Sequence, residues 1–236
     1  MDIALISRRG FIKGSGALIV SFSFSGPLSR VLAQSESSSN PEPDAASLDS
    51  WLAIAQDGEV TVFTSKVDLG TGVETALAQI VAEELDVPVM RIKMEVGDTA
   101  NTVEQGATVG SNTIQRGGPQ LRQAAAAARQ ELLKLASARL GSPVDQLVVN
   151  DGIVSVAGGL DKKVSYADLI GNKRFNVKIT ATGTGFNLKV APEVRAKDPK
   201  DYRVVGTSVR RVDLPRKFTG EFSYTQDFRL PGMLHG

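Results

Sequence analysis

A long alanine-rich segment, PQLRQAAAAARQELLKLASARLG at residues 119–141, constrains the fold of this chain more than any other feature. Five successive alanines favour a helix, Pro119 suits its first turn, and Gly141 suits its end. Alanine side chains also let neighbouring backbone approach closely. We therefore predict a long helix here and interpret it as a packing element rather than a functional one.

Shorter segments around this helix alternate in the manner of strands. WLAIAQ and EVTVFTS flank Asp57-Gly58, and QLVVN and IVSVA flank Asp151-Gly152, so each set predicts a β-hairpin. MRIKMEV, at residues 90–96, alternates apolar and charged residues and predicts a half-buried strand.

A second main helix is predicted at residues 75–85. Its apolar residues Leu77, Ile80, Val81 and Leu85 share one face, and we expect Glu83 and Glu84 to lie mainly outside it. Pro88 closes this helix, and SYADLIG predicts a short third one. The fold class is therefore α+β, with hairpins and short mixed sheets packed against two main helices.

The segments before and after this region differ in composition. Residues 34–50 are rich in serine, proline and acids and predict a flexible linker, with order beginning at Trp51. APEVRAKDPKDYRVVG, at residues 191–206, predicts a second linker. DFRLPGMLHG, at residues 227–236, reads as a turn leading into a strand.

Composition excludes several classes of function. The net charge of +1, with both signs interspersed, gives no electrostatic reason to expect nucleic acid as a partner. The absence of cysteine excludes disulfides, thiolate metal sites and iron–sulfur clusters held by this chain. A single histidine, His235, cannot build a zinc site or a Ser-His-Asp triad. We assign no metal-ligating residue.

The first residues resemble an export signal. Ser7-Arg8-Arg9-Gly10-Phe11-Ile12-Lys13 is similar to the twin-arginine motif, and the apolar run ALIVSFSFSGPL and the small residues of VLAQS follow it. We predict a signal at residues 1–33, cleaved after Ala33, which sends the chain to the periplasm. Retention of the apolar stretch as a membrane anchor and a basic amphipathic helix stay open as alternatives. Twin-arginine export carries folded cargo, which implies a cofactor.

Two glycine-rich loops are the candidate binding elements. VDLGTGVET, at residues 67–75, leads into a predicted helix start, where backbone N–H groups favour an anion, but taken alone this loop is explained better by a tight turn. It matches neither the dinucleotide fingerprint nor the P-loop. GDTANTVEQGATVGSNTIQRGG, at residues 97–118, also precedes a helix and carries many hydroxyl and amide groups. Together these loops indicate a polar, phosphorylated cofactor.

These loops, with YRVVGTSVRRVDLPRKFTGEFSYTQDFRLPGMLHG at residues 202–236, resemble the molybdopterin-binding large subunit of the xanthine dehydrogenase/aldehyde oxidase family. Within it, the chain is similar to the branch that contains the β subunits of isoquinoline 1-oxidoreductase and the B subunit of nicotinate dehydrogenase. The resemblance covers residues 50–236. It implies a partial molybdopterin-binding domain at residues 51–195, then a linker and the beginning of a hammerhead domain at residues 196–236.

The resemblance also implies which residues contact the cofactor, a molybdenum molybdopterin often extended to a cytosine dinucleotide. Leu69–Gly72 matches a Gly-Gln-Gly loop near the pterin, with Thr71 where many members have a longer glutamine. Thr108–Thr113 matches a segment that wraps the pterin and its phosphate. The candidate cofactor-binding residues are Gly70, Thr71, Gly72, Gln105, Thr108, Gly110, Ser111, Asn112 and Thr113. For Gln105 and Asn112, an ordinary loop role remains open.

Members of this family hydroxylate an aldehyde or an N-heterocycle with oxygen from water. The family's catalytic glutamate lies beyond the stretch that this chain matches, and none of Glu74, Glu83, Glu84 or Glu104 corresponds to it. We assign no catalytic residue and expect the chain alone to be inactive.

The implied partners are the remainder of the large subunit or a companion chain, a small [2Fe-2S] subunit, a cytochrome c and the twin-arginine translocase. The alternatives are the N-terminal subunit of a split enzyme and a non-catalytic exported binding or assembly protein.

Overall fold

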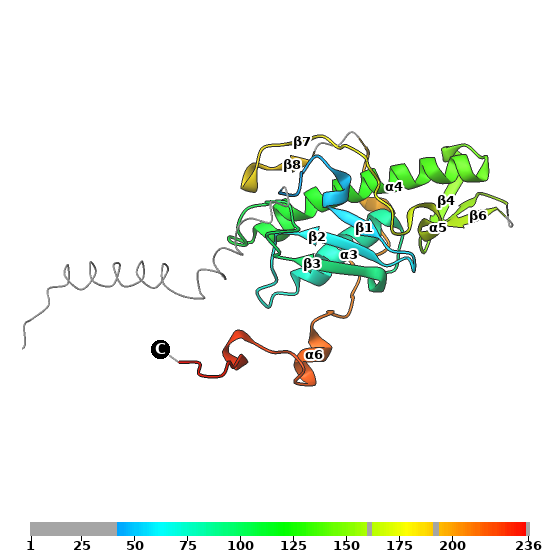
Figure 1. Ribbon diagram of the computed structural model, residues 1–236. Coiled ribbons are helices and arrows are strands. Elements are labelled where there is room, and N and C mark those ends of the chain that lie inside the picture. Colours follow the sequence, from blue (N-terminus) through cyan, green and yellow to red (C-terminus); the bar gives the residue numbers. More distant parts are fainter. Residues whose placement is uncertain (1–41, 160–161, 191–193, 235–236) are drawn as a thin grey trace, which may run out of the picture. The chain divides into compact units, whose positions relative to one another are not determined.

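The computed structural model describes residues 42–159, 162–190 and 194–234 (Figure 1). The predicted export signal at residues 1–33, its cleavage site and the linker residues 34–41 lie outside the described residues. His235 also lies outside them.

A three-stranded mixed sheet forms the first layer of the fold. β1 (Leu52–Ile54) and β2 (Val60–Thr64) are antiparallel, as the first predicted hairpin requires, and Gly58 in the turn has a φ of 85°. β3 (Ile92–Val96) lies beside β2 and runs parallel to it, with Val60 opposite Ile92. Parallel neighbours need a crossover connection, and the helix between β2 and β3 supplies it.

The two predicted main helices are both present. α3 (Val73–Leu85) connects β2 to β3 and packs against the long helix α4 (Gly118–Leu140), which a π-helical turn at Thr113–Gly117 precedes (Figure 1). Ala124, Ala125, Ala126 and Ala128 of α4 are fully buried. The interpretation of the alanine-rich segment as a packing helix is therefore confirmed.

The second predicted hairpin lies in a separate antiparallel sheet. β4 (Leu147–Asn150) pairs with β5 (Ile153–Val156), which pairs with β6 (Lys163–Ser165). Asp151 and Gly152 both have positive φ, at 51° and 73°, which a two-residue turn of this hand requires. The short helix α5 (Tyr166–Ile170) follows, and a capping box of Ser165 and Asp168 fixes its start.

The remaining elements are short. β7 (Ala181–Thr182) pairs with β8 (Lys189–Val190), and α6 (Leu214–Phe218) lies near the end of the described chain. The 3₁₀ turns are Leu48–Ser50, Val89–Arg91, Val144–Gln146, Gly185–Asn187, Pro199–Asp201 and Thr225–Asp227. The mixed α+β class with small sheets is thus confirmed.

The packed chain begins earlier than the predicted Trp51. Leu48 is fully buried, and its N–H donates to the carbonyl of Val177 over 3.0 Å. The Trp51 indole N–H donates back to the carbonyl of Ala45 over 2.9 Å. Residues 34–50 were predicted as a flexible linker because they are rich in serine and proline. One apolar residue in this segment, Leu48, nevertheless packs into the core and attaches residues 42–50 to the domain.

Glu83 and Glu84 do not lie outside the packed face of α3 as predicted. Both side chains are buried, at 2% and 1% exposure. They contact α4 and the segment at residues 197–205, which was predicted as a plain linker. Helical periodicity placed Glu83 and Glu84 off the apolar face, and it could not reveal the partners that bury them, because those partners lie far away in the sequence.

The strand expected after the turn in DFRLPGMLHG is also absent, because the described residues 194–234 contain helical turns but no strand. A strand needs a neighbour to receive its backbone hydrogen bonds, and no free edge pairs with these residues. Among the helices that the structure describes, none combines the length and the apolar character needed to cross a membrane.

Candidate functional site

The two glycine-rich loops meet in one open groove of about 520 Å³. Its volume falls within the range of small-molecule and cofactor sites. Five predicted residues line it, namely Thr71, Thr108, Gly110, Ser111 and Thr113. The apolar side chains of Leu69, Val73, Val109 and Ile114 complete its walls with Gln115. Gly70, Gly72, Gln105 and Asn112 are not among the lining residues.

The first loop uses its backbone donors internally. The Asp68 carboxylate accepts hydrogen bonds from the N–H groups of Gly70 (2.8 Å), Gly72 (3.1 Å) and Glu74 (3.2 Å). Burial raises the pKa of this carboxyl, but these N–H groups outweigh burial and hold the pKa below its usual value. A carboxylate from the chain itself therefore occupies the start of α3, which favours the tight-turn alternative for Gly70 and Gly72.

The second loop is fastened to the end of β2 by successive residues. Thr64 Oγ1 and the N–H of Ser65 donate to Gln105 Oε1, over 2.6 and 3.1 Å. The N–H of Val67 donates to Thr108 Oγ1 over 3.0 Å. These contacts tie the second loop to the end of β2 and, through Val67 and Thr108, to the first loop.

The side chain of Lys66 holds the second loop against the end of β2. Its side chain is 1% exposed, and Nζ donates to the carbonyls of Gln105 (2.9 Å), Gly106 (2.8 Å) and Ala107 (3.2 Å). Burial lowers the pKa of this ammonium group. A side chain at Gly117 would begin 3.3 Å from the Lys66 stem, so the lysine also packs beneath the π-helical turn.

The amide of Gln105 points into the domain rather than into the groove. Its Nε2 donates to Gln120 Oε1 over 2.6 Å, and Gln120 in turn donates to the carbonyl of Leu188 over 2.7 Å. Both the oxygen and the nitrogen of the Gln105 amide are thus hydrogen-bonded within the domain. The structure therefore gives Gln105 an internal role, which is the alternative left open for it from the sequence.

Asn112 likewise has a local role, because its Nδ2 donates to the carbonyl of Val109 over 2.9 Å. Gly110 and Ser111, just before it, both adopt left-handed backbone with φ of 56° and 58°. For serine this conformation is uncommon. It directs the chain into the π-helical turn at Thr113–Gly117, whose start is not capped by a side chain.

These features test whether the groove fits a pterin cofactor. An uncapped helix start offers backbone N–H groups to a phosphate, and the hydroxyls of Thr71, Ser111 and Thr113 offer neutral donors beside it. Thr108 Oγ1 accepts from Val67, which leaves its own O–H free to donate. The donor set therefore fits a polar, phosphorylated ligand along one wall.

The groove donors are not accompanied by a cluster of metal-ligating side chains. Within the described ranges, no three His, Asp or Glu side chains gather closely enough to hold an ion. A metal at this groove would thus need its ligands from a bound cofactor or from another polypeptide segment.

Sequence reasoning missed two residues of this site, Asp68 and Lys66. Asp68 stands two positions before Gly70, a spacing that predicts an Asx turn, so a signal existed. Lys66 carries no comparable signal, since its carbonyl partners lie 39 to 41 positions away.

This chain is similar in sequence to known proteins along most of its length. The family model described as "Molybdopterin cofactor-binding domain" matches residues 12–225. The B subunit of nicotinate dehydrogenase from Pseudomonas putida is 44% identical over 186 residues, which cover 79% of this chain and 15% of that protein. The β subunit of isoquinoline 1-oxidoreductase from Brevundimonas diminuta is 29% identical over 258 residues, covering 98% of this chain and 33% of that protein.

A solved structure of quinoline 2-oxidoreductase from Pseudomonas putida 86 is 29% identical, with a TM-score of 0.43, over 58% of this chain and 19% of that one. The chain therefore spans about a third or less of the length of the proteins that it matches.

Proposed function

Because this chain belongs to the family of molybdopterin cofactor-binding domains, we propose that it forms one wall of the cofactor site in an exported molybdenum hydroxylase large subunit. Members of the family are molybdopterin oxidoreductases of the xanthine dehydrogenase type. The observation that carries the proposal is the groove in which Thr71, Thr108, Gly110, Ser111 and Thr113 converge from two separate loops.

In this function the described residues bind and orient. The helix start at Thr113 and the hydroxyls of Thr108 and Ser111 face a phosphate group, since neutral donors at a helix start favour negative charge. The apolar side chains of Val109 and Ile114, which line the same groove, would hold the ring system of the cofactor. When bound, the molybdenum cofactor supplies the two-electron oxidation that no side chain of this chain can perform.

The finer features of the proposal rest on the resemblance. The cofactor is the cytosine dinucleotide form, the substrate is an aldehyde or an N-heterocycle, and the catalytic glutamate comes from the remainder of the large subunit or from a companion chain. A small [2Fe-2S] subunit and, beyond it, a cytochrome c would accept the electrons; this sequence has no cysteine with which to hold a cluster of its own. The twin-arginine translocase delivers the loaded protein to the periplasm.

The test compares the full chain expressed alone with the chain expressed together with the polypeptide encoded directly downstream. We expect the chain alone to turn over neither an aldehyde nor an N-heterocycle. The pair should copurify with molybdenum and pterin in equal amounts and should release cytidine monophosphate on mild acid hydrolysis. Turnover by the chain alone, or a pair that folds and carries neither molybdenum nor pterin, would refute the proposal.

Two variants test the groove itself in this pair. Thr71→Val and Ser111→Ala remove hydroxyls from the groove, and their combination should lower pterin content at least about tenfold, since each lost hydrogen bond to a charged group is worth roughly 1.5–3 kcal/mol. Thr182→Val, at an exposed threonine of β7 outside the groove, is the matched control and should retain its pterin. Equal pterin content in the wild-type pair, the Thr71→Val/Ser111→Ala double variant and the Thr182→Val control would count against this groove as the site.

A further inference from the structure

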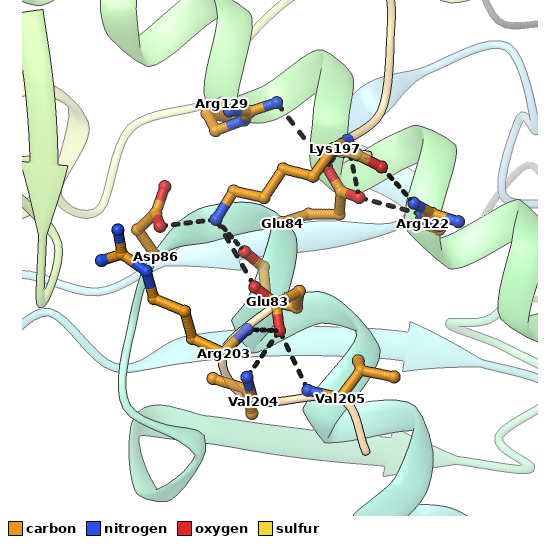
Figure 2. A network of polar contacts seen from close by, with 9 residues as sticks. All are labelled: Glu83, Glu84, Asp86, Arg122, Arg129, Lys197, Arg203, Val204 and Val205. Atoms are coloured by element: carbon orange, nitrogen blue, oxygen red, sulfur yellow. Dashed lines mark hydrogen bonds and ion pairs between the residues drawn. The ribbon is translucent and has the colours of Figure 1, made fainter. Parts of the chain in front are cut away.

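A buried carboxylate on α3 gathers three successive backbone donors from a distant segment (Figure 2). Glu83 Oε2 accepts from the N–H groups of Arg203 (2.9 Å), Val204 (2.6 Å) and Val205 (2.9 Å). Three N–H groups that converge on one oxygen form a specific seat for an anion. Glu83 therefore fixes the path of residues 203–205 across the surface of α3.

The adjacent carboxylate holds the beginning of the same segment. Both oxygens of Glu84 accept from the N–H of Lys197 at 3.1 Å, and Oε1 also accepts from Arg122 Nε of α4 at 2.9 Å. Arg122 donates in turn to the carbonyl of Lys197. Glu84 thus joins three parts of the chain, namely α3, α4 and residue 197 (Figure 2).

Lys197 completes the charge balance. Its Nζ donates to the carbonyl of Glu83 and to Asp86 Oδ1, just beyond the end of α3. The three acids Glu83, Glu84 and Asp86 face three cations, Lys197, Arg122 and Arg129. Buried charges are tolerated only when paired in this way, and removal of one partner is strongly destabilising.

We name residues 197–205 the strap. Outside the charged network, Gln79 Nε2 of α3 donates to the carbonyls of Val204 (3.0 Å) and Thr207 (3.2 Å). The Arg122 guanidinium lies 5.0 Å from the centre of the Tyr202 ring. The strap is therefore held at both of its ends by α3 and α4.

The strap covers a cavity of about 290 Å³ that adjoins the candidate groove. Tyr202 and Val205 of the strap line it on one side, and Ile114, Gly118 and Pro119 of the helix start line it on the other. Ile114 also lines the groove, so the same turn of helix separates the two spaces. At Gly118 the helices are in close contact, because an added side chain would begin 3.1 Å from Ile80 Cδ1.

We infer that Glu83 and Glu84 are positioning residues that hold the strap over this cavity and thereby fix the helix start at residues 113–119, which carries one wall of the groove. The inference rests on the proposed function for the role of the groove, but the coupling between strap and helix start belongs to this chain alone. Neither glutamate lines the groove: Glu83 acts through the strap, and Glu84 acts through the strap and through Arg122 of α4.

Hydrogen–deuterium exchange of the full chain without cofactor tests the coupling. Glu83→Ala removes the acceptor of three N–H groups, and we expect exchange at least about tenfold faster in residues 197–205 and also in residues 113–119. Glu83→Gln keeps an acceptor oxygen and should restore most of the protection. Within residues 147–165, the strands β4, β5 and β6 of the second sheet serve as an internal reference, and their exchange should be unchanged.

Two further variants guard against a general loss of folding. Gln79→Ala removes only the outer contacts to Val204 and Thr207 and should give the same regional pattern at smaller amplitude. Glu131→Gln, at a partly exposed ion pair on α4, is the matched control and should leave exchange unchanged. A strap that opens while residues 113–119 keep their protection would overturn the inference, as would uniform acceleration that includes residues 147–165.

Pterin content in the copurified pair is the second measurement. We expect Gln79→Ala to lower it relative to Glu131→Gln, and equal pterin content in these two variants would contradict the positioning role. If the wild-type pair holds no pterin, the proposed function fails, whereas the exchange pattern still decides whether the strap and the helix start are coupled.

Discussion

At the scale of single residues, charged side chains of the protein itself bind backbone groups of the glycine-rich loops. Asp68 supplies a carboxylate to the start of α3, and Lys66 supplies an ammonium group to three loop carbonyls. Both side chains satisfy backbone groups that would otherwise need water or a bound partner. The loops are consequently shaped before any cofactor binds.

Lys66→Met should show how much this shaping contributes to stability. The substitution keeps an apolar stem against Gly117 but leaves the carbonyls of Gln105, Gly106 and Ala107 without their donor. We expect the free energy of unfolding to fall by about 2–3 kcal/mol, measured by urea denaturation. Lys93→Met, at an exposed ion pair with Glu95, is the control and should leave it nearly unchanged. Equal stability of the two variants would contradict this account of Lys66.

Asp68→Asn should reveal a pH-dependent contribution. The folded-state pKa of Asp68 is lowered, so its ionised form stabilises the fold above the pKa of the unfolded chain, and this contribution disappears as pH falls through the lower folded pKa. We expect wild type to be more stable than Asp68→Asn by about 1 kcal/mol near pH 7 and by much less near pH 3. Urea midpoints at the two pH values measure this difference. Asp145→Asn, at an exposed residue, is the control for removal of a surface carboxylate. A difference for Asp68→Asn that grew on acidification would have the wrong sign and would contradict this account of Asp68.

At the scale of elements, local patterns predicted the hairpins and the long helix because the residues that decide them are neighbours in sequence. Asp57-Gly58 and Asp151-Gly152 specify their turns directly, and the alanine run specifies α4. The parallel pairing of β2 with β3 was not predicted, since it depends on a crossover rather than on a turn.

The close packing of α4 yields a prediction at this scale. Ala128 is fully buried in the core, so Ala128→Leu should force neighbouring side chains apart and lower the free energy of unfolding by about 1–3 kcal/mol. Gln130→Leu, at an exposed position two residues along the same helix, should change it by less than about 0.5 kcal/mol. Thermal or urea unfolding compares the two, and an Ala128→Leu variant as stable as Gln130→Leu would show that α4 packs loosely there.

At the scale of the whole molecule, the sequence revealed the site loops but not what holds them. The loop at residues 97–118 could be identified because glycine and hydroxyl residues gather before a helix, and the family resemblance then singled out Thr108, Gly110 and Ser111, which line the groove. The roles of Glu83, Glu84 and Gln105 could not, because their partners lie between 15 and 122 positions away. Helical periodicity alone assigned both glutamates to solvent, which the buried pairing contradicts.

The contact between Glu83 and Arg203 also sets an order of events during synthesis. The two residues are 120 positions apart. At a translation rate of 5–20 residues per second, the ribosome needs roughly 6–24 s to make Arg203 after Glu83 has been added. Throughout that interval α3 can form its local hydrogen bonds, but its two carboxylates still lack the strap. Since long-range contacts close after local ones, α3 is made and paired locally well before the strap can close over its two carboxylates.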